Sequence, residues 1–265
     1  MILHALLIGA LVGVVVGSLG AGGGIVSVPI LVYILGQNPH QATGLSLIIV
    51  GLTAAVSLAT RARSGSVAWR EGTIFALAGL AGTWAGAALA PLVSARTLML
   101  SFCALLVAVA IFMVRSQLRP MDPSSHEAGA QPRDQRSWTL ATVGRVVALA
   151  TLTGFLTGFF GVGGGFAIVP ALHLALRYPM RRASATSLLV MVITAAFGLA
   201  SRTLSGTLTI TAEAGAMVAL FAGASMVGGF VGARLTARVS NRLLGLVFAA
   251  LLIIVAASTL AATLA

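Results

Sequence analysis

The sequence predicts an all-α polytopic membrane protein made of two inverted-topology repeats, each a glycine-rich broken-helix hairpin followed by three transmembrane helices. Three observations predict this fold. Hydrophobic residues make up 58% of the 265 residues and charged residues only 8%, with a mean hydropathy of +1.06. Most of the protein must therefore face lipid or other parts of the chain. Apolar runs of 18 or more residues recur along the chain, and the second half repeats the first.

The internal repeat is clearest in the glycines. Adding 141 to a residue number in the first half leads to the same residue type at many positions in the second half. The matching glycines are Gly13, Gly17, Gly20, Gly22, Gly23 and Gly24 with Gly154, Gly158, Gly161, Gly163, Gly164 and Gly165. Further matches are Pro29 with Pro170, Ser46 with Ser187, and Arg61 with Arg202. We therefore divide the chain into a first repeat (1–114), a cytoplasmic linker (115–141) and a second repeat (142–265).

Each repeat is expected to contain five helical segments. The first apolar helix covers 2–19 and 142–160, and a glycine cluster separates it from a short apolar piece at 25–36 and 166–176. A helix of about 11 or 12 residues rises roughly 17 Å, which is half of a hydrocarbon core, so the short pieces cannot cross alone. The three longer helices are expected at 42–60, 72–93 and 97–114, and at 183–201, 212–235 and 243–264. Later in each repeat the offset is 146, so that Gly82 and Gly86 match Gly228 and Gly232. The four-residue spacing of each glycine pair is typical of close helix packing.

The arginines favour one topology over another. If every helix simply crosses, there are eight spans and the 16 arginines divide 9 to 7 across the membrane. If the first helix and the short piece form a hairpin that returns to the same side, the division becomes 14 to 2, with only Arg96 and Arg202 opposite. Loop arginines stay on the cytoplasmic side, so the hairpin topology is preferred. It places the linker inside, both termini outside and the second half inverted.

The doubled glycine cluster is the candidate binding site, with each cluster expected to meet the other near the midplane of the bilayer. Irregular backbone at that depth must be buried in protein or line a wet cavity. The free N–H groups at the start of each short helix would favour an anion there. The predicted substrate-binding residues are Gly20, Gly22, Gly23, Gly24, Ser46, Gly161, Gly163, Gly164, Gly165, Thr186 and Ser187. The alternative is that glycines only permit tight helix crossing, which we prefer for Gly13 and Gly17.

Several function classes have little support. Nucleic-acid binding is excluded because the arginines lie in short gaps between apolar runs, and the single Cys103 rules out an intrachain disulfide. The sequence predicts no catalytic residues, no cofactor and no metal site, so an enzyme is not expected. Glu71 and Glu213 are expected to be solvated or to cap helices. His173 is the candidate for proton coupling, against the more conservative interpretation of a hydrogen-bonded interior histidine.

The paired segments "GSLGAGGGIVSVPIL" and "GFFGVGGGFAIVPAL", together with the later "ASATSLL", resemble the TauE/SafE sulfite exporter family, also described as 4-toluene sulfonate uptake permeases. The first copy departs from the pattern, because Leu45 stands where the second has Thr186. The resemblance implies a permease of the bacterial inner membrane that moves sulfite, a sulfonate or a related organosulfur anion. Its expected partners are this anion and the lipid bilayer, with a homodimer as the candidate assembly. The alternatives are a passive anion channel and a membrane scaffold without transport.

Overall fold

The computed structural model describes residues 2–20, 24–34, 36–62, 65–118, 140–162, 164–176, 178–206, 212–235 and 239–264. Throughout these ranges the secondary structure is helical and contains no strand. The first half forms α1 (Ile2–Leu19), α2 (Gly24–Pro29) with a π-helical turn η1 (Ile30–Ile34), α3 (Pro39–Ala62), α4 (Trp69–Leu89) with a 3₁₀ turn η2 (Ala90–Leu92), and α5 (Ala95–Leu118). The second half forms α7 (Leu140–Phe160), α8 (Gly165–Leu176), α9 (Met180–Leu204), α10 (Ala212–Leu235) and α11 (Asn241–Leu264).

Seven of the described helices are long and apolar enough to cross a membrane. They are Pro39–Ala62, Trp69–Leu92, Ala95–Arg115, Val143–Phe160, Met180–Leu204, Val218–Leu235 and Arg242–Thr263. The predicted all-α polytopic membrane protein is therefore confirmed. The expected short pieces correspond to Gly24–Ile34 and Gly165–Leu176. Most of the predicted linker, 119–139, lies outside the described residues.

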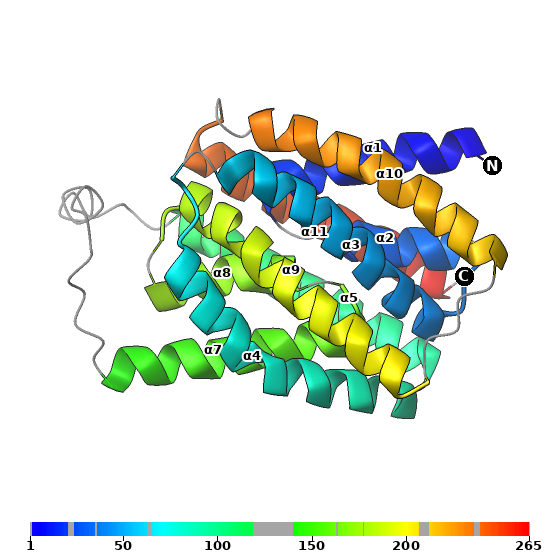
Figure 1. Ribbon diagram of the computed structural model, residues 1–265, viewed down its shortest axis with the longest axis horizontal. Coiled ribbons are helices and arrows are strands. Elements are labelled where there is room, and N and C mark those ends of the chain that lie inside the picture. Colours follow the sequence, from blue (N-terminus) through cyan, green and yellow to red (C-terminus); the bar gives the residue numbers. More distant parts are fainter. Residues whose placement is uncertain are drawn as a thin grey trace.

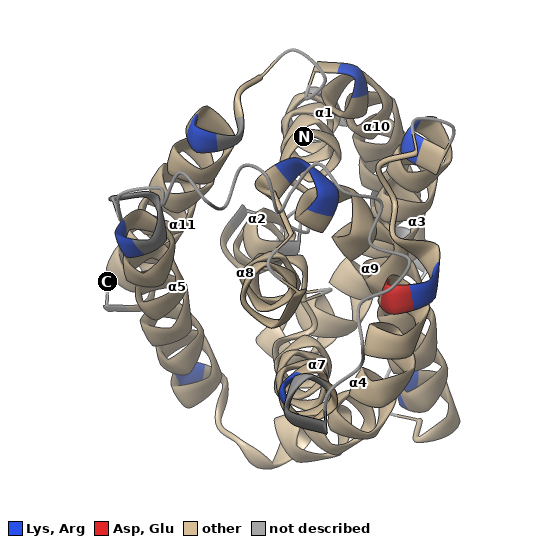
Figure 2. Ribbon diagram, turned by 90° about the vertical axis from the view of Figure 1, so that its left-hand side faces the viewer, with Lys and Arg blue, Asp and Glu red and all other residues tan. Residues whose placement is uncertain are grey.

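The helices run roughly along the long axis of the molecule (Figure 1). Seen end-on, α2 and α8 lie at the centre, and the other helices surround them in four pairs (Figure 2). These pairs are α1 with α10, α4 with α7, α3 with α9, and α5 with α11, and the helices of each pair pack against one another. In every pair one helix comes from each half, so the two halves are interlocked through the whole bundle.

Glycines form the seams of two of these pairs. A Cβ atom on Gly13 would lie 2.0 Å from the carbonyl oxygen of Ser225, and one on Gly228 would lie 2.1 Å from that of Ala10. The equivalent seam joins α7 to α4, where a Cβ on Gly154 would lie 2.0 Å from the Gly79 oxygen. Any side chain there would push the helices apart, so close backbone packing requires glycine. The packing interpretation of Gly13 and Gly17 is thereby confirmed.

The equivalent helices α3 and α9 run antiparallel. A Cβ on Gly51 would lie 3.4 Å from the Ala195 Cβ, whereas one on Gly198 would lie 3.3 Å from a Leu47 methyl carbon, so residue numbers rise in opposite directions. The opposite insertion of the two halves into a membrane stays a prediction, and this antiparallel pairing supports it.

Most described arginines lie at one end of the bundle (Figure 2). This end holds the start of α4, α7, α9 and α11 and the end of α3, α5 and α10 (Figure 1). Its arginines are Arg61, Arg70, Arg115, Arg145, Arg181, Arg182, Arg234 and Arg242. Arg96 and Arg202 lie at the opposite end. The hairpin topology predicts this division, and the cytoplasmic location of the arginine-rich end stays a prediction.

Candidate functional site

The end of α1 turns sharply at Gly20 and packs there on the other half of the chain. Gly20 has a φ of +61°, in the left-handed region that favours glycine. A Cβ on Gly20 would also lie 2.1 Å from the carbonyl oxygen of Ser184, near the start of α9. Ser187, one turn later, donates a hydrogen bond from its Oγ to the Gly20 carbonyl oxygen over 2.6 Å. Gly20 is thus fixed both by its backbone conformation and by its contact with α9.

The end of α7 repeats this arrangement on α3. Gly161 has a φ of +64°, and a Cβ there would lie 2.2 Å from the carbonyl oxygen of Thr43. Ser46 donates from its Oγ to the Gly161 carbonyl oxygen. Thr43 and Ser46 are the counterparts of Ser184 and Ser187 in the repeat. We call these two contacts the Gly20 seal and the Gly161 seal.

The two seals lie far apart, so Gly20 and Gly161 do not share one midplane site, and a shared site for the other predicted glycines stays a prediction. Gly161 packs against Thr43, and Arg61 follows Thr43 by 18 residues in the same helix. That interval corresponds to roughly 27 Å along a helix axis. Arg61 contacts Ser184, which belongs to the Gly20 seal. The two seals are separated because α1 and α7 are long. These helices have 18 and 21 residues and carry the two glycine turns towards opposite ends of the bundle.

A buried arginine lies beside each seal. Arg61 is 5% exposed and donates to the Ser184 hydroxyl over 2.9 Å and to the Ser18 carbonyl oxygen over 3.0 Å, as well as to the Gly17 carbonyl. Its counterpart Arg202 is 3% exposed and donates to the Gly158 carbonyl oxygen over 2.8 Å. Both therefore bind the last turn of the helix that precedes a glycine segment, where a helix carries partial negative charge.

These arginines were not among the predicted site residues. Because they stand at the ends of apolar runs, their positions predict a role in membrane topology. One signal could have revealed them: Arg61 and Arg202 are matched by the same offset of 141 as the glycines.

The second glycine segment leads directly into α8. Gly164 has a φ of +65°, and its carbonyl oxygen accepts from the amides of Ala167 and Ile168 over 2.9 and 2.8 Å, so it caps the helix. A Cβ on Gly164 would lie 1.8 Å from the Thr157 Oγ1. Gly165 is buried in the first turn of α8, and Gly24 begins α2. Gly22, Gly23 and Gly163 lie outside the described residues.

The Thr186 side chain contacts the start of α4 and makes neither of the seal hydrogen bonds. Its Oγ1 accepts a hydrogen bond from the Ala68 amide over 3.1 Å, at the start of α4. A Cβ on Gly72 would lie 2.9 Å from the Thr186 methyl carbon. The structure thus brings Ser46 and Ser187 to the glycine segments and places Thr186 against α4.

The family model described as "Sulfite exporter TauE/SafE" matches residues 5–259 of the chain. The chain belongs to the TauE/SafE family. A protein of Xylella fastidiosa (strain 9a5c), named a probable membrane transporter protein, is 39% identical over 69% of this chain and 67% of its own length. A probable membrane transporter protein of Bacillus subtilis (strain 168) is 29% identical over 75% of this chain and 77% of its own. No solved structure matches. This TauE/SafE chain is accordingly a membrane transporter.

His173 of this TauE/SafE transporter lies in the last turn of α8, away from Gly165 at its start. It is partly buried, and its Nδ1 lies 2.7 Å from the Tyr178 carbonyl oxygen. The Tyr178 ring in turn lies beneath the Arg182 guanidinium at 4.7 Å. The hydrogen bond fits the conservative interpretation, and proton coupling through His173 stays a prediction. Glu71 is partly buried in the first turn of α4, whereas the Glu213 side chain lies outside the described part of the chain.

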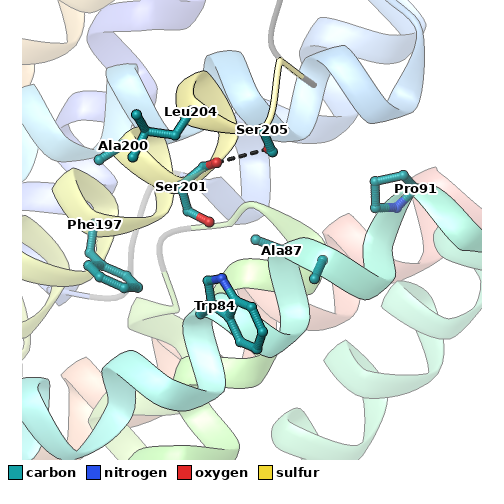
Figure 3. Close-up of a pocket in the computed structure, with 9 residues that line it drawn as sticks. Trp84, Ala87, Pro91, Phe197, Ala200, Ser201, Leu204 and Ser205 are labelled. Carbon is teal, nitrogen blue, oxygen red and sulfur yellow. Dashed lines mark hydrogen bonds between the residues drawn. The ribbon is translucent and has the colours of Figure 1, made fainter.

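A groove of about 570 Å³ opens between the C-terminal ends of α4 and α9 (Figure 3). Trp84 and Phe197 line it, and the hydroxyl of Ser205 is already bonded to the Ser201 carbonyl oxygen over 2.8 Å. Trp84 is 61% exposed and Leu204 88%. None of its lining residues belongs to either seal. An apolar, outward-facing groove of this kind suits contact with lipid better than recognition of an anion.

Proposed function

We propose that this TauE/SafE transporter is a secondary transporter that moves a small sulfur-containing anion across the bacterial cytoplasmic membrane by alternating access. Sulfite, a sulfonate or a related organosulfur compound is the expected substrate class. Two observations support the proposal: the family is described by sulfite export, and two equivalent seals lie towards opposite ends of the bundle.

The two seals suggest how access alternates. In the structure the Ser187–Gly20 and Ser46–Gly161 hydrogen bonds are both made, and in this proposal that arrangement is the state closed at both ends. Two equivalent structural repeats can exchange conformations, so that one seal opens while the other stays closed. The substrate would then pass between the seals in two steps, without a continuous pore at any moment.

The chemistry near each seal suits an anion. Glycine lets an oxyanion approach the backbone amides closely because no Cβ is present. A buried guanidinium adds positive charge, in a planar form that suits binding of oxyanions. The amides of Gly20 and Gly161 already donate to the carbonyl oxygens of Val16 and Thr157, so the other predicted glycines would supply amides. Arg61 and Arg202 would supply charge. The predicted pocket thus becomes two related half-sites, each associated with one seal.

Flux into liposomes tests the proposal. Purified transporter would be reconstituted and assayed with sulfite, sulfoacetate, taurine, thiosulfate and sulfate, each with and without a pH gradient. We expect saturable flux of at least one sulfur anion and accumulation above equilibrium when the gradient is imposed. Flux that only equilibrates the substrate under every gradient would instead indicate the passive channel. No flux and no substrate-dependent thermal shift with any of the five would reject transport of this class.

A further inference from the structure

Three helices meet at Gly229, where α10 packs against both α1 and α3 (Figure 2). A Cβ on Gly17 of α1 would lie 2.1 Å from the Gly229 carbonyl oxygen. On the side of α3, a Cβ on Gly229 itself would lie 2.7 Å from the Oγ of Ser57, which is fully buried. Glycine at position 229 therefore lets α10 contact both neighbours closely.

The contacts around Gly229 close into a loop through Arg61. Arg61 follows Ser57 by four residues, so both lie on the same face of α3. The Arg61 guanidinium donates to the carbonyl oxygen of Gly17, which packs against Gly229. We call Gly17, Ser57, Arg61 and Gly229 the first joint. Because α1 packs on α10, the spacing between α10 and α3 sets how far the Gly17 carbonyl lies from Arg61.

An equivalent joint connects α7, α4 and α9. A Cβ on Gly158 would lie 2.0 Å from the Thr83 carbonyl oxygen, and one on Gly198 would lie 3.5 Å from the Thr83 methyl carbon. The Arg202 guanidinium donates to the Gly158 carbonyl oxygen over 2.8 Å. These four residues form the second joint. The offset of 141 maps Gly17, Ser57 and Arg61 to Gly158, Gly198 and Arg202, and the offset of 146 maps Thr83 to Gly229.

The two joints differ because the hydroxyl residue and the glycine have changed places. In the first joint α3 carries Ser57 and α10 carries Gly229, whereas in the second α9 carries Gly198 and α4 carries Thr83. Each joint therefore has one glycine and one small hydroxyl residue where its two helices meet. Buried contacts respond to a change of even one methylene group, and the exchange keeps the side-chain volume between the helices similar in both joints.

We propose that the Ser57–Gly229 and Gly198–Thr83 pairs are positioning residues, which set the distance at which Arg61 and Arg202 bind the helix end before each seal. A bulkier pair in the first joint moves α10 away from α3, and α1 moves with α10 because their glycine seam is close packed. The Gly17 carbonyl then separates from Arg61, and the Gly20 seal loosens. The inference goes beyond the proposed function, because this positioning does not depend on which substrate is carried.

Hydrogen exchange of the purified full-length transporter, read by mass spectrometry, tests the first joint. Gly229→Thr adds a second hydroxyl side chain opposite Ser57. We expect exchange around 16–20 to rise between about fivefold and about a hundredfold, the range for an overpacked contact, and exchange around 157–161 to stay at the wild-type rate. Gly223→Thr is the matched control. Gly223 is an exposed residue of the same helix, a Cβ there meets no atom within 4 Å, and both turns should exchange as in the wild type.

Exchanging the pair separates positioning from general destabilisation. The double variant Ser57→Gly/Gly229→Thr has the arrangement of the second joint, so exchange around 16–20 should return to within about threefold of the wild-type rate. Insertion of the double variant where Gly229→Thr alone fails to insert would support the inference in the same way. If neither inserts, Gly229→Ala and Ser57→Gly/Gly229→Ala repeat the comparison with a smaller side chain. Exchange that is as fast in the double variant as in the single one, or that rises equally at both glycine turns in Gly229→Thr, would overturn the inference.

Sulfite flux into liposomes relates the joint to transport. Gly229→Thr should lose flux, because Arg61 no longer holds the end of α1, and the double variant should recover it. Full flux in Gly229→Thr together with wild-type exchange around 16–20 would also overturn the inference. If exchange responds as expected but the wild type itself carries no sulfur anion, the joints stand and the proposed function fails.

Discussion

Ser187 reaches across the boundary between the two halves of the chain and donates a hydrogen bond to the carbonyl oxygen of Gly20. Both groups are fully buried or nearly so, and the same bond recurs between Ser46 and Gly161. Each half therefore holds the glycine turn of the other. Loss of one bond should release one turn and leave the other in place.

Ser187→Ala and Ser46→Ala should accordingly loosen opposite ends of the transporter. A buried carbonyl that loses its donor costs about 1 kcal/mol, or roughly fivefold in a local opening equilibrium. Hydrogen exchange read by mass spectrometry should show faster exchange around 16–20 in Ser187→Ala and around 157–161 in Ser46→Ala. Ser101→Ala, which removes a local bond within α5, serves as a control. Faster exchange at both turns in each single variant would argue against two separable seals.

Arg61 should matter far more than other arginines at the same end of the bundle. It joins the last turn of α1 to Ser184 of α9, and hydrogen bonds to a charged group contribute about 1.5–3 kcal/mol. We expect Arg61→Gln to lower the unfolding temperature in detergent by roughly 5 to 10 °C and to abolish flux. Arg61→Lys should retain only part of the thermal stability and part of the flux, because an ammonium group lacks the planar fork that bridges two helices.

The exposed Arg70 provides the matched control, since it lies at the same end of the bundle. Arg70→Gln should change stability by no more than about 0.5 kcal/mol. Equal losses in the Arg61 and Arg70 variants would show that net positive charge, and not the bridging contact, is what stabilises this end.

Much of the fold followed from the sequence because its signals are periodic or duplicated. Apolar runs located the long helices to within a few residues, and the offset of 141 related Gly13 to Gly154 before any packing was known. The glycine spacing also predicted the seams, since four-residue spacing places glycines on one helix face. The local sequence pattern was sufficient to predict those features that depend on a single helix.

The seals could not be predicted in this way, because they depend on distances between elements. The sequence does not show how far along the bundle α7 extends before Gly161 packs against Thr43. The two glycine turns were therefore expected at one midplane site. Arg61 posed a similar difficulty, because an arginine at the end of an apolar run resembles an interfacial anchor. Only the packed structure shows that its side chain turns inward and binds α1 and α9.

Gly17 and Gly144 should respond oppositely to the same substitution. A Cβ on Gly17 would lie 2.1 Å from the Gly229 carbonyl oxygen, whereas one on Gly144 meets no atom within 4 Å. Gly17→Ala must separate α1 from α10, and overpacking of this kind costs about 1–3 kcal/mol. Gly144→Ala should leave stability unchanged or raise it by up to about 1 kcal/mol, because alanine favours a helix more than glycine does. Thermal unfolding in detergent compares the two, and an equally stable Gly17→Ala would refute the close seam.

The orientation of the bundle in the membrane is open to a direct test. Eight of the ten described arginines, Arg61, Arg70, Arg115, Arg145, Arg181, Arg182, Arg234 and Arg242, lie at one end, and loop arginines remain cytoplasmic because they resist translocation. The C-terminal end of α11 lies at the opposite end of the bundle (Figure 1). A C-terminal alkaline phosphatase fusion should therefore be active and a C-terminal fluorescent-protein fusion dark, with the reverse result for insertions between residues 119 and 139. A fluorescent C-terminal fusion would mean that the arginine-rich end faces outward, so that the half-site next to Arg61 would open to the outside.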